Sequence, residues 1–85
     1  MNKEWIFLHL NEARKELTDT IQEMEQNPEY NFGEYFVAMM HLYNHLNTAW
    51  NSRDASPERV KACTTEEFER WRQFSTDIDM SVTYS

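Results

Sequence analysis

An apolar repeat in the first third of the chain constrains the fold most strongly. Apolar residues recur at spacings of four, three, four, four and three, at Ile6, Leu10, Ala13, Leu17, Ile21 and Met24. This rhythm places side chains on one face of an α-helix. The repeat ends at Asn27-Pro28, because a proline disfavours the helical conformation of the residue before it. The sequence therefore predicts a helix from about Lys3 to Gln26 that buries this row, while Trp5 and Leu8 lie outside the row and need a second contact.

A second long helix is predicted after the proline. Asn31 stands three residues before Glu34, and such a pair can satisfy the free amides at a helix start. We expect this helix to reach about Arg53, a length of roughly 30 Å at 1.5 Å per residue. Its apolar residues share one broad face that should form much of the core: Tyr35, Phe36, Met39, Leu42, Tyr43, Leu46 and Trp50.

The last third of the chain predicts shorter elements. Ser56-Pro57 is a helix start, with proline at the first helical position, and should open a short turn of helix through Ala62. Thr64 and Glu67 form another capping pair, which predicts a third helix to about Phe74 with Phe68, Trp71 and Phe74 facing inward. Residues 77–84 alternate polar and apolar, the period of a strand. No second strand candidate exists, so we expect residues 76–85 to form an extended tail over the helices or an edge offered to another chain.

These elements predict a single all-α domain over residues 1–85. Two long antiparallel helices form a small bundle with a shorter third helix and an extended C-terminal tail. A chain of 85 residues lies near the lower limit for folding on its own core. It must use its apolar residues well or share them with a partner.

Charge and composition narrow the classes of function. The net charge is −7, and no Lys or Arg occurs from Glu16 to Ser52, which disfavours direct binding of nucleic acid. The apolar run from Trp5 to Leu8 is too short for a signal peptide or a membrane span. The single cysteine, Cys63, suits a reducing compartment. We therefore expect a soluble cytoplasmic protein without a membrane contact.

An acidic row on the first helix is the first candidate site. Glu12, Glu16, Asp19 and Glu23 recur at helical spacing opposite the apolar row. They can form an ordinary solvated face. However, few basic residues balance them, and Glu23 stands near a helix C-terminus, where the helix dipole disfavours negative charge. The alternative is a surface that binds a basic protein partner.

The segment HLYNHLNTAWNSR in the second helix carries two further candidates. His41 and His45 are four residues apart on the face opposite the apolar one, and such a pair can bind one metal ion. The pair supplies only two ligands, so solvated histidines or a contact with a partner remain open. Asn44, Asn47 and Asn51 share one flank. They are poor helix formers, and they form either a polar border of the helix or a hydrogen-bonding strip for a partner.

No catalytic motif stands out, and the sequence predicts no cofactor. The leading hypothesis is a non-enzymatic acidic helical protein that binds a protein partner as an adaptor, regulator or inhibitor. One version inhibits a basic nucleic-acid-binding protein. The alternative is a homodimeric helical bundle that binds a metal or a small ligand through the face of His41 and His45.

Overall fold

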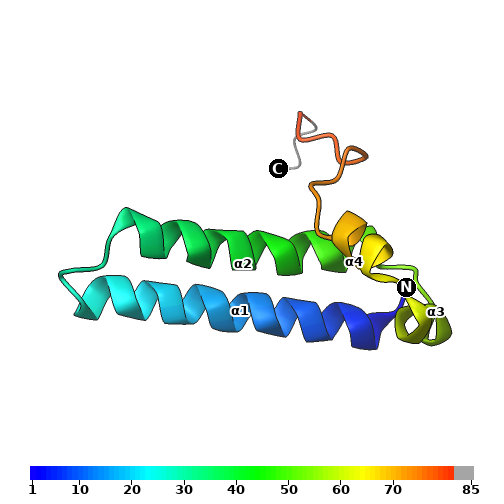
Figure 1. Cartoon of the computed structure of the whole chain (residues 1–85), viewed down its shortest axis with the longest axis horizontal. Coiled ribbons are helices and arrows are strands. Elements are labelled where there is room, and N and C mark those ends of the chain that lie inside the picture. The colour runs from blue at the N-terminus through cyan, green and yellow to red at the C-terminus, as the bar shows by residue number, and fades with distance from the viewer. Residues whose placement is uncertain (82–85) are drawn as a thin grey trace.

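The computed structural model describes residues 1–81 and places four helices and no strand among them (Figure 1). The helices are α1 (Lys3–Gln26), α2 (Phe32–Asn51), α3 (Pro57–Ala62) and α4 (Thr65–Trp71). The two long helices lie side by side in opposite directions, and α4 packs against α2 near the end where the chain begins. The predicted all-α fold with a long antiparallel hairpin is confirmed. We call the end that holds residues 27–31 the loop end of the hairpin, and the other end the open end.

A short polar side chain begins each of the four described helices. In every case its oxygen accepts a hydrogen bond from the backbone amide three residues later, as in Asn2 to Trp5 and Asn31 to Glu34; Ser56 and Thr64 do the same for α3 and α4. These bonds satisfy amides that have no partner inside the helix. The starts of α2, α3 and α4 were predicted from these residues, whereas the cap at Asn2 was not.

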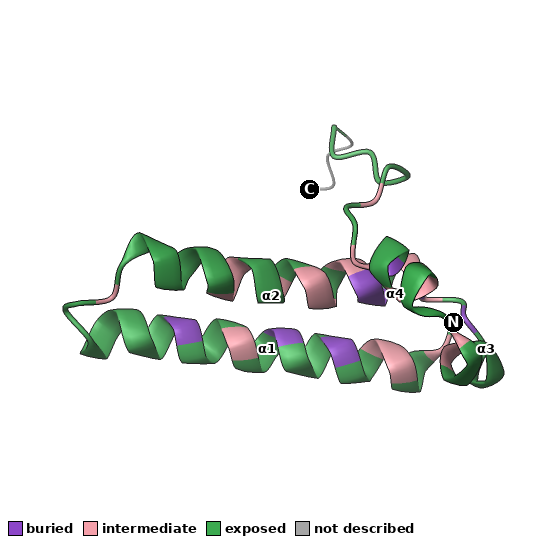
Figure 2. Ribbon diagram, viewed as in Figure 1, coloured by how far each residue is buried: buried purple, intermediate pink, exposed green. Residues whose placement is uncertain are grey.

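The row of α1 that packs against α2 differs from the prediction. The buried residues of α1 are His9, Ala13 and Thr20, and Figure 2 shows the buried segments of α1 in purple along the side nearest α2. Leu10, Leu17, Ile21 and Met24 are 43–54% exposed. Except for Ala13 and the half-buried Ile6, the predicted row is therefore not buried. The periodicity correctly predicted a helix, but the prediction of its buried face was wrong.

Small side chains at the helix contact explain this difference. Ala13 and Thr20 of α1 and Ala49 of α2 are buried, and short side chains let two helices approach closely. At about 100° per residue, the exposed apolar row of α1 lies about 70° around the helix from its buried residues, and that of α2 lies about 120° from its own. Because the helices are antiparallel, both rows turn to the same side of the hairpin.

We call this side the apolar face. Its exposed members are 38–54% accessible: Leu10, Leu17, Ile21 and Met24 of α1, and Tyr35, Leu46 and Trp50 of α2. Ile6 and Leu10 line a shallow groove there together with Leu46 and Trp50 of α2, which places the two helices' apolar rows on one surface.

The open end of the hairpin is closed by hydrogen bonds and by α4. The amide of Asn2 donates to the carbonyl of Arg53 at 2.7 Å, and the indole Nε1 of Trp5 donates to Ser52 Oγ at 2.6 Å. The ring of Trp71 on α4 is buried and lies 6.3 Å from that of Trp5. The expected second contact of Trp5 is therefore found, on the side away from the apolar face.

Three details at the end of α2 and in the C-terminal third differ from the prediction. α4 ends at Trp71, so Phe74 is outside the helix and 67% exposed, with its ring against Tyr43. Trp50 was predicted to be core but is 38% exposed. Its Nε1 donates to Asp77 Oδ1 at 2.8 Å, and Arg53 lies 4.0 Å from its ring centroid. Residues 76–81 contain bends and a turn rather than a strand, and the rest of the predicted alternation, residues 82–84, lies outside the described residues.

Candidate partner-binding groove

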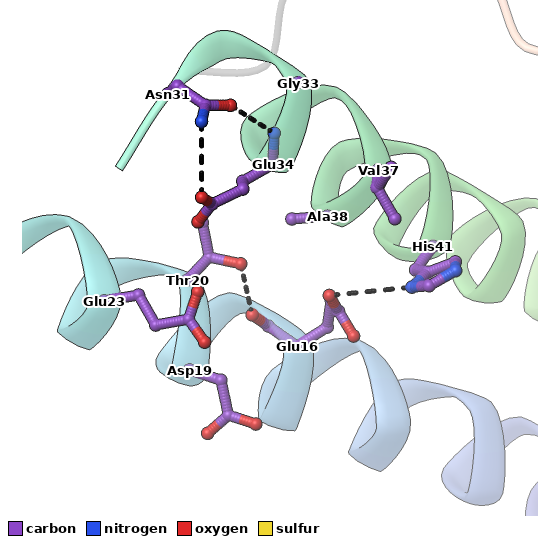
Figure 3. Close-up of a pocket in the computed structure, with 10 residues that line it drawn as sticks. All are labelled: Glu16, Asp19, Thr20, Glu23, Asn31, Gly33, Glu34, Val37, Ala38 and His41. Carbon is purple, nitrogen blue, oxygen red and sulfur yellow. Dashed lines mark hydrogen bonds and ion pairs between the residues drawn. The ribbon is translucent and has the colours of Figure 1, made fainter. Parts of the chain in front are cut away.

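An open groove runs between α1 and α2 near the loop end, on the side opposite the apolar face. Its volume is about 600 Å³, and its charged lining is Glu16, Asp19 and Glu23 from α1 and Glu34 from α2. We call these four residues and the surface between them the acidic groove. Figure 3 shows Glu16 reaching across towards His41, while the carboxylate of Asp19 points away from α2.

The predicted acidic row is thus split by the structure. Glu16, Asp19 and Glu23 line the groove, whereas Glu12 is exposed one turn nearer the open end and is not part of its lining. Glu34 joins the groove from the start of α2. Sequence reasoning treated Glu34 only as a capping residue, because the pairing of the two helices decides which carboxylates face one another.

Negative charge is poorly balanced in the acidic groove. Within residues 1–81 the only ion pair of its four carboxylates joins Glu16 Oε1 to His41 Nδ1 at 3.8 Å, and it requires a protonated histidine. Glu23 lies in the last turn of α1, where the helix dipole disfavours negative charge. This turn contains no basic residue that would offset the effect. Burial, followed by the charges of Glu23 and Glu34, raises the pKa of Tyr30 at the loop. The loop end therefore has a negative potential that a cation would relieve.

The two predicted metal ligands do not converge on one point. His41 approaches Glu16, whereas His45 Nδ1 lies 3.1 Å from Nδ1 of His9 on α1. Among residues 1–81, no group of three or more His, Cys, Asp or Glu side chains has a metal-binding arrangement. The metal site at His41 and His45 stays a prediction without a third ligand in the described part of the chain.

His9 is a buried titratable residue that sequence reasoning missed. Its ring stacks edge-on against Trp5 with centroids 4.4 Å apart, and its Nε2 is enclosed without a hydrogen-bond partner in the described structure. Burial and then the charge of His45 lower the pKa of His9, partly offset by Glu12. The hydrogen bond between the Nδ1 atoms of His9 and His45 needs one proton, and we assign this proton to His9. The enclosed Nε2 of His9 then carries a lone pair rather than an N–H group without an acceptor. The sequence signal that could have indicated a buried His9 is its position inside the apolar run IFLHL.

The asparagine strip binds the end of α4. Nδ2 of Asn47 donates to the carbonyl of Arg72 at 2.9 Å. Nδ2 of Asn51 donates to the carbonyls of Trp71 at 2.8 Å and Gln73 at 2.6 Å. The carbonyls of Trp71 and Arg72 are among those that a helix C-terminus leaves without an internal partner, and Gln73 follows directly after the helix. Asn44 makes no such bond and lines a small pocket beside His45 and Phe68. The role of the three residues in binding a partner stays a prediction, but two of them hold α4 in place.

Comparison with known proteins adds no relative to this description. No protein-family model, curated protein or solved structure matches the chain. In residues 1–81, none of the helices has the length and apolar character needed to cross a membrane.

Proposed function

We propose that this protein is a non-enzymatic interaction protein whose acidic groove binds a basic segment of a protein partner. The observation that carries the proposal is the gathering of Glu16, Asp19, Glu23 and Glu34 from two helices around one open groove. Residues 16–52 contain no Lys or Arg. Repulsion among four carboxylates costs free energy in the free protein, and a Lys- or Arg-rich segment in the groove would relieve it.

The net charge of −7 supports the same proposal through association kinetics. A field of one sign raises the encounter rate with an oppositely charged partner, and salt screens this effect. Such a partner can be a basic nucleic-acid-binding protein, for which the acidic groove would compete with phosphate. The protein would then act as an adaptor, regulator or inhibitor.

The test is calorimetric titration of the full chain with a synthetic Lys- and Arg-rich peptide at low and at high salt. The groove variant is Glu16→Gln/Asp19→Asn/Glu23→Gln. The matched control is Glu58→Gln/Glu66→Gln/Glu69→Gln, which removes the same three charges from exposed positions on α3 and α4. At a few tenths to 1 kcal/mol for each exposed pair, the groove variant should bind about tenfold more weakly, and the control should bind nearly as well as the unmodified chain.

Equal weakening in the two variants would contradict the proposal, because it would assign binding to the total charge rather than to the groove. Absence of peptide binding at low salt would also contradict it. With the same pair of variants, capture from a lysate of the native source identifies the partner as the protein that the control retains and the groove variant loses.

A further inference from the structure

We infer that the apolar face is the interface of a homodimer in which two hairpins stack in opposite directions. The inference is independent of the proposed function, because the acidic groove lies on the other side of the hairpin and stays open. Three observations support it: the size of the apolar face, the small core of the single chain, and the distribution of charge along the hairpin.

The apolar face is large for a chain of this length. Seven apolar side chains on it are 38–54% exposed, and at about 200 Å² for a large side chain this amounts to roughly 600 Å². The half-buried Ile6, Met39 and Leu42 bring the area towards about 800 Å², which is what each partner contributes to a stable interface of standard size. Monomeric proteins rarely leave so large a continuous patch in water.

The core of the single chain contains few apolar residues. Among residues 1–81, the buried hydrophobic residues are three alanines and one tryptophan: Ala13, Ala49, Ala55 and Trp71. Small domains with too little core commonly gain one by oligomerisation. A second hairpin on the apolar face would create a four-helix core from residues that are exposed in one chain.

The distribution of charge favours one direction for the second copy. Residues 16–52 carry six acidic residues and no Lys or Arg, and all six lie towards the loop end, from Glu16 to Glu34. The rest of the chain carries all eight basic residues against nine acidic ones. A second copy with its loop end over the open end of the first keeps the two acidic ends apart. The parallel arrangement would place them together, where like charges repel.

The resulting geometry is a two-fold axis between the apolar faces that crosses the helices at mid-length. Such an interface is self-complementary, as closed homodimers require. In it, α1 runs antiparallel to α1 of the second copy, and Lys3 lies beside Glu25 of that copy. On the helical projection both residues flank the apolar row of α1, at opposite ends of the helix.

Sedimentation equilibrium of the full chain tests the inference, with Leu17→Glu as the interface variant and Leu8→Glu as its control. Leu17 and Leu8 belong to the same helix and are 48% and 51% exposed, but only Leu17 lies on the apolar face. The unmodified chain and Leu8→Glu should sediment at twice the chain mass of 10.3 kDa. Leu17→Glu should sediment as a monomer that keeps its helical circular dichroism.

A monomer for the unmodified chain at high concentration would overturn the inference and leave the apolar face to a different protein. Equal dissociation by the two variants would overturn the choice of face. For the direction, Lys3→Glu should weaken the dimer several-fold, and Lys3→Glu/Glu25→Lys should restore it. Failure of the double variant to restore the dimer would overturn the antiparallel arrangement.

Discussion

The asparagines of α2 offer a quantitative test of how α4 is held. Replacing Asn51 by alanine removes the two hydrogen bonds that its Nδ2 donates to the carbonyls of Trp71 and Gln73. At about 1 kcal/mol net for each bond, the loss amounts to about 2 kcal/mol. Alanine is the better helix former, which returns about 0.5 kcal/mol. Asn51→Ala should therefore lower the free energy of unfolding by about 1.5 kcal/mol.

Asn44→Ala is the matched control, since Asn44 lies on the same flank of α2 and its side chain makes no hydrogen bond within residues 1–81. This variant has only the gain in helix propensity, so it should be stabilised by about 0.5 kcal/mol. The two variants should thus differ by about 2 kcal/mol, which corresponds to about 10 °C in Tm for a domain of this size.

The assay is thermal unfolding followed by circular dichroism, at one protein concentration, because self-association would make Tm concentration-dependent. Asn51→Asp sharpens the test. It preserves the shape of the side chain but turns a carboxylate towards the carbonyl oxygens, so it should be less stable than Asn51→Ala at neutral pH. Equal melting temperatures for Asn51→Ala and Asn44→Ala would refute the assignment of Asn51 as the residue that caps α4.

Three further predictions concern the hairpin itself. Because burial lowers the pKa of His9 below its ordinary 6.5, the unfolded chain binds protons more readily; stability should fall as pH drops through 6.5, and His9→Gln should reduce this dependence in urea unfolding. Ala13→Leu should destabilise the fold by about 1–3 kcal/mol through overpacking at the contact of α1 and α2, whereas Arg14→Leu, at the neighbouring exposed position, should change it little. Asn31→Ala should cost about 1 kcal/mol in thermal unfolding by removing the cap of α2; an unchanged Tm would contradict this role.

The elements of the fold were predictable because their signals are local. The spacing of apolar residues predicted both long helices, and start signals at Asn31, Ser56 and Thr64 located the starts of α2, α3 and α4. The end of α4 was predicted three residues too late. A run of favourable residues does not reveal that Asn47 and Asn51, distant in sequence, donate hydrogen bonds to the carbonyls at the end of the helix.

The candidate sites were predictable only as lists of residues. Their charge and helical spacing grouped Glu16, Asp19 and Glu23 in the sequence, but Glu34 entered the acidic groove through the pairing of α1 with α2. Similarly, His41 and His45 share a helical face, and the structure turns them towards different partners, Glu16 and His9. Contacts between helices depend on rotation about each axis, which spacing within one helix leaves undetermined.

The sequence by itself determined the helices, their caps, the turn at Asn27-Pro28 and the separation of an acidic segment from the basic ones. Only the tertiary structure decided which face of each helix meets the other. Apolar burial is non-directional, so an apolar row can be covered equally well by its own hairpin or by another chain. The short side chains of Ala13, Thr20 and Ala49 are buried at the contact, while Leu10, Leu17 and Leu46 stay exposed on the apolar face. The physical reason is steric, because the closest packing of two helices follows side-chain size as well as hydrophobicity.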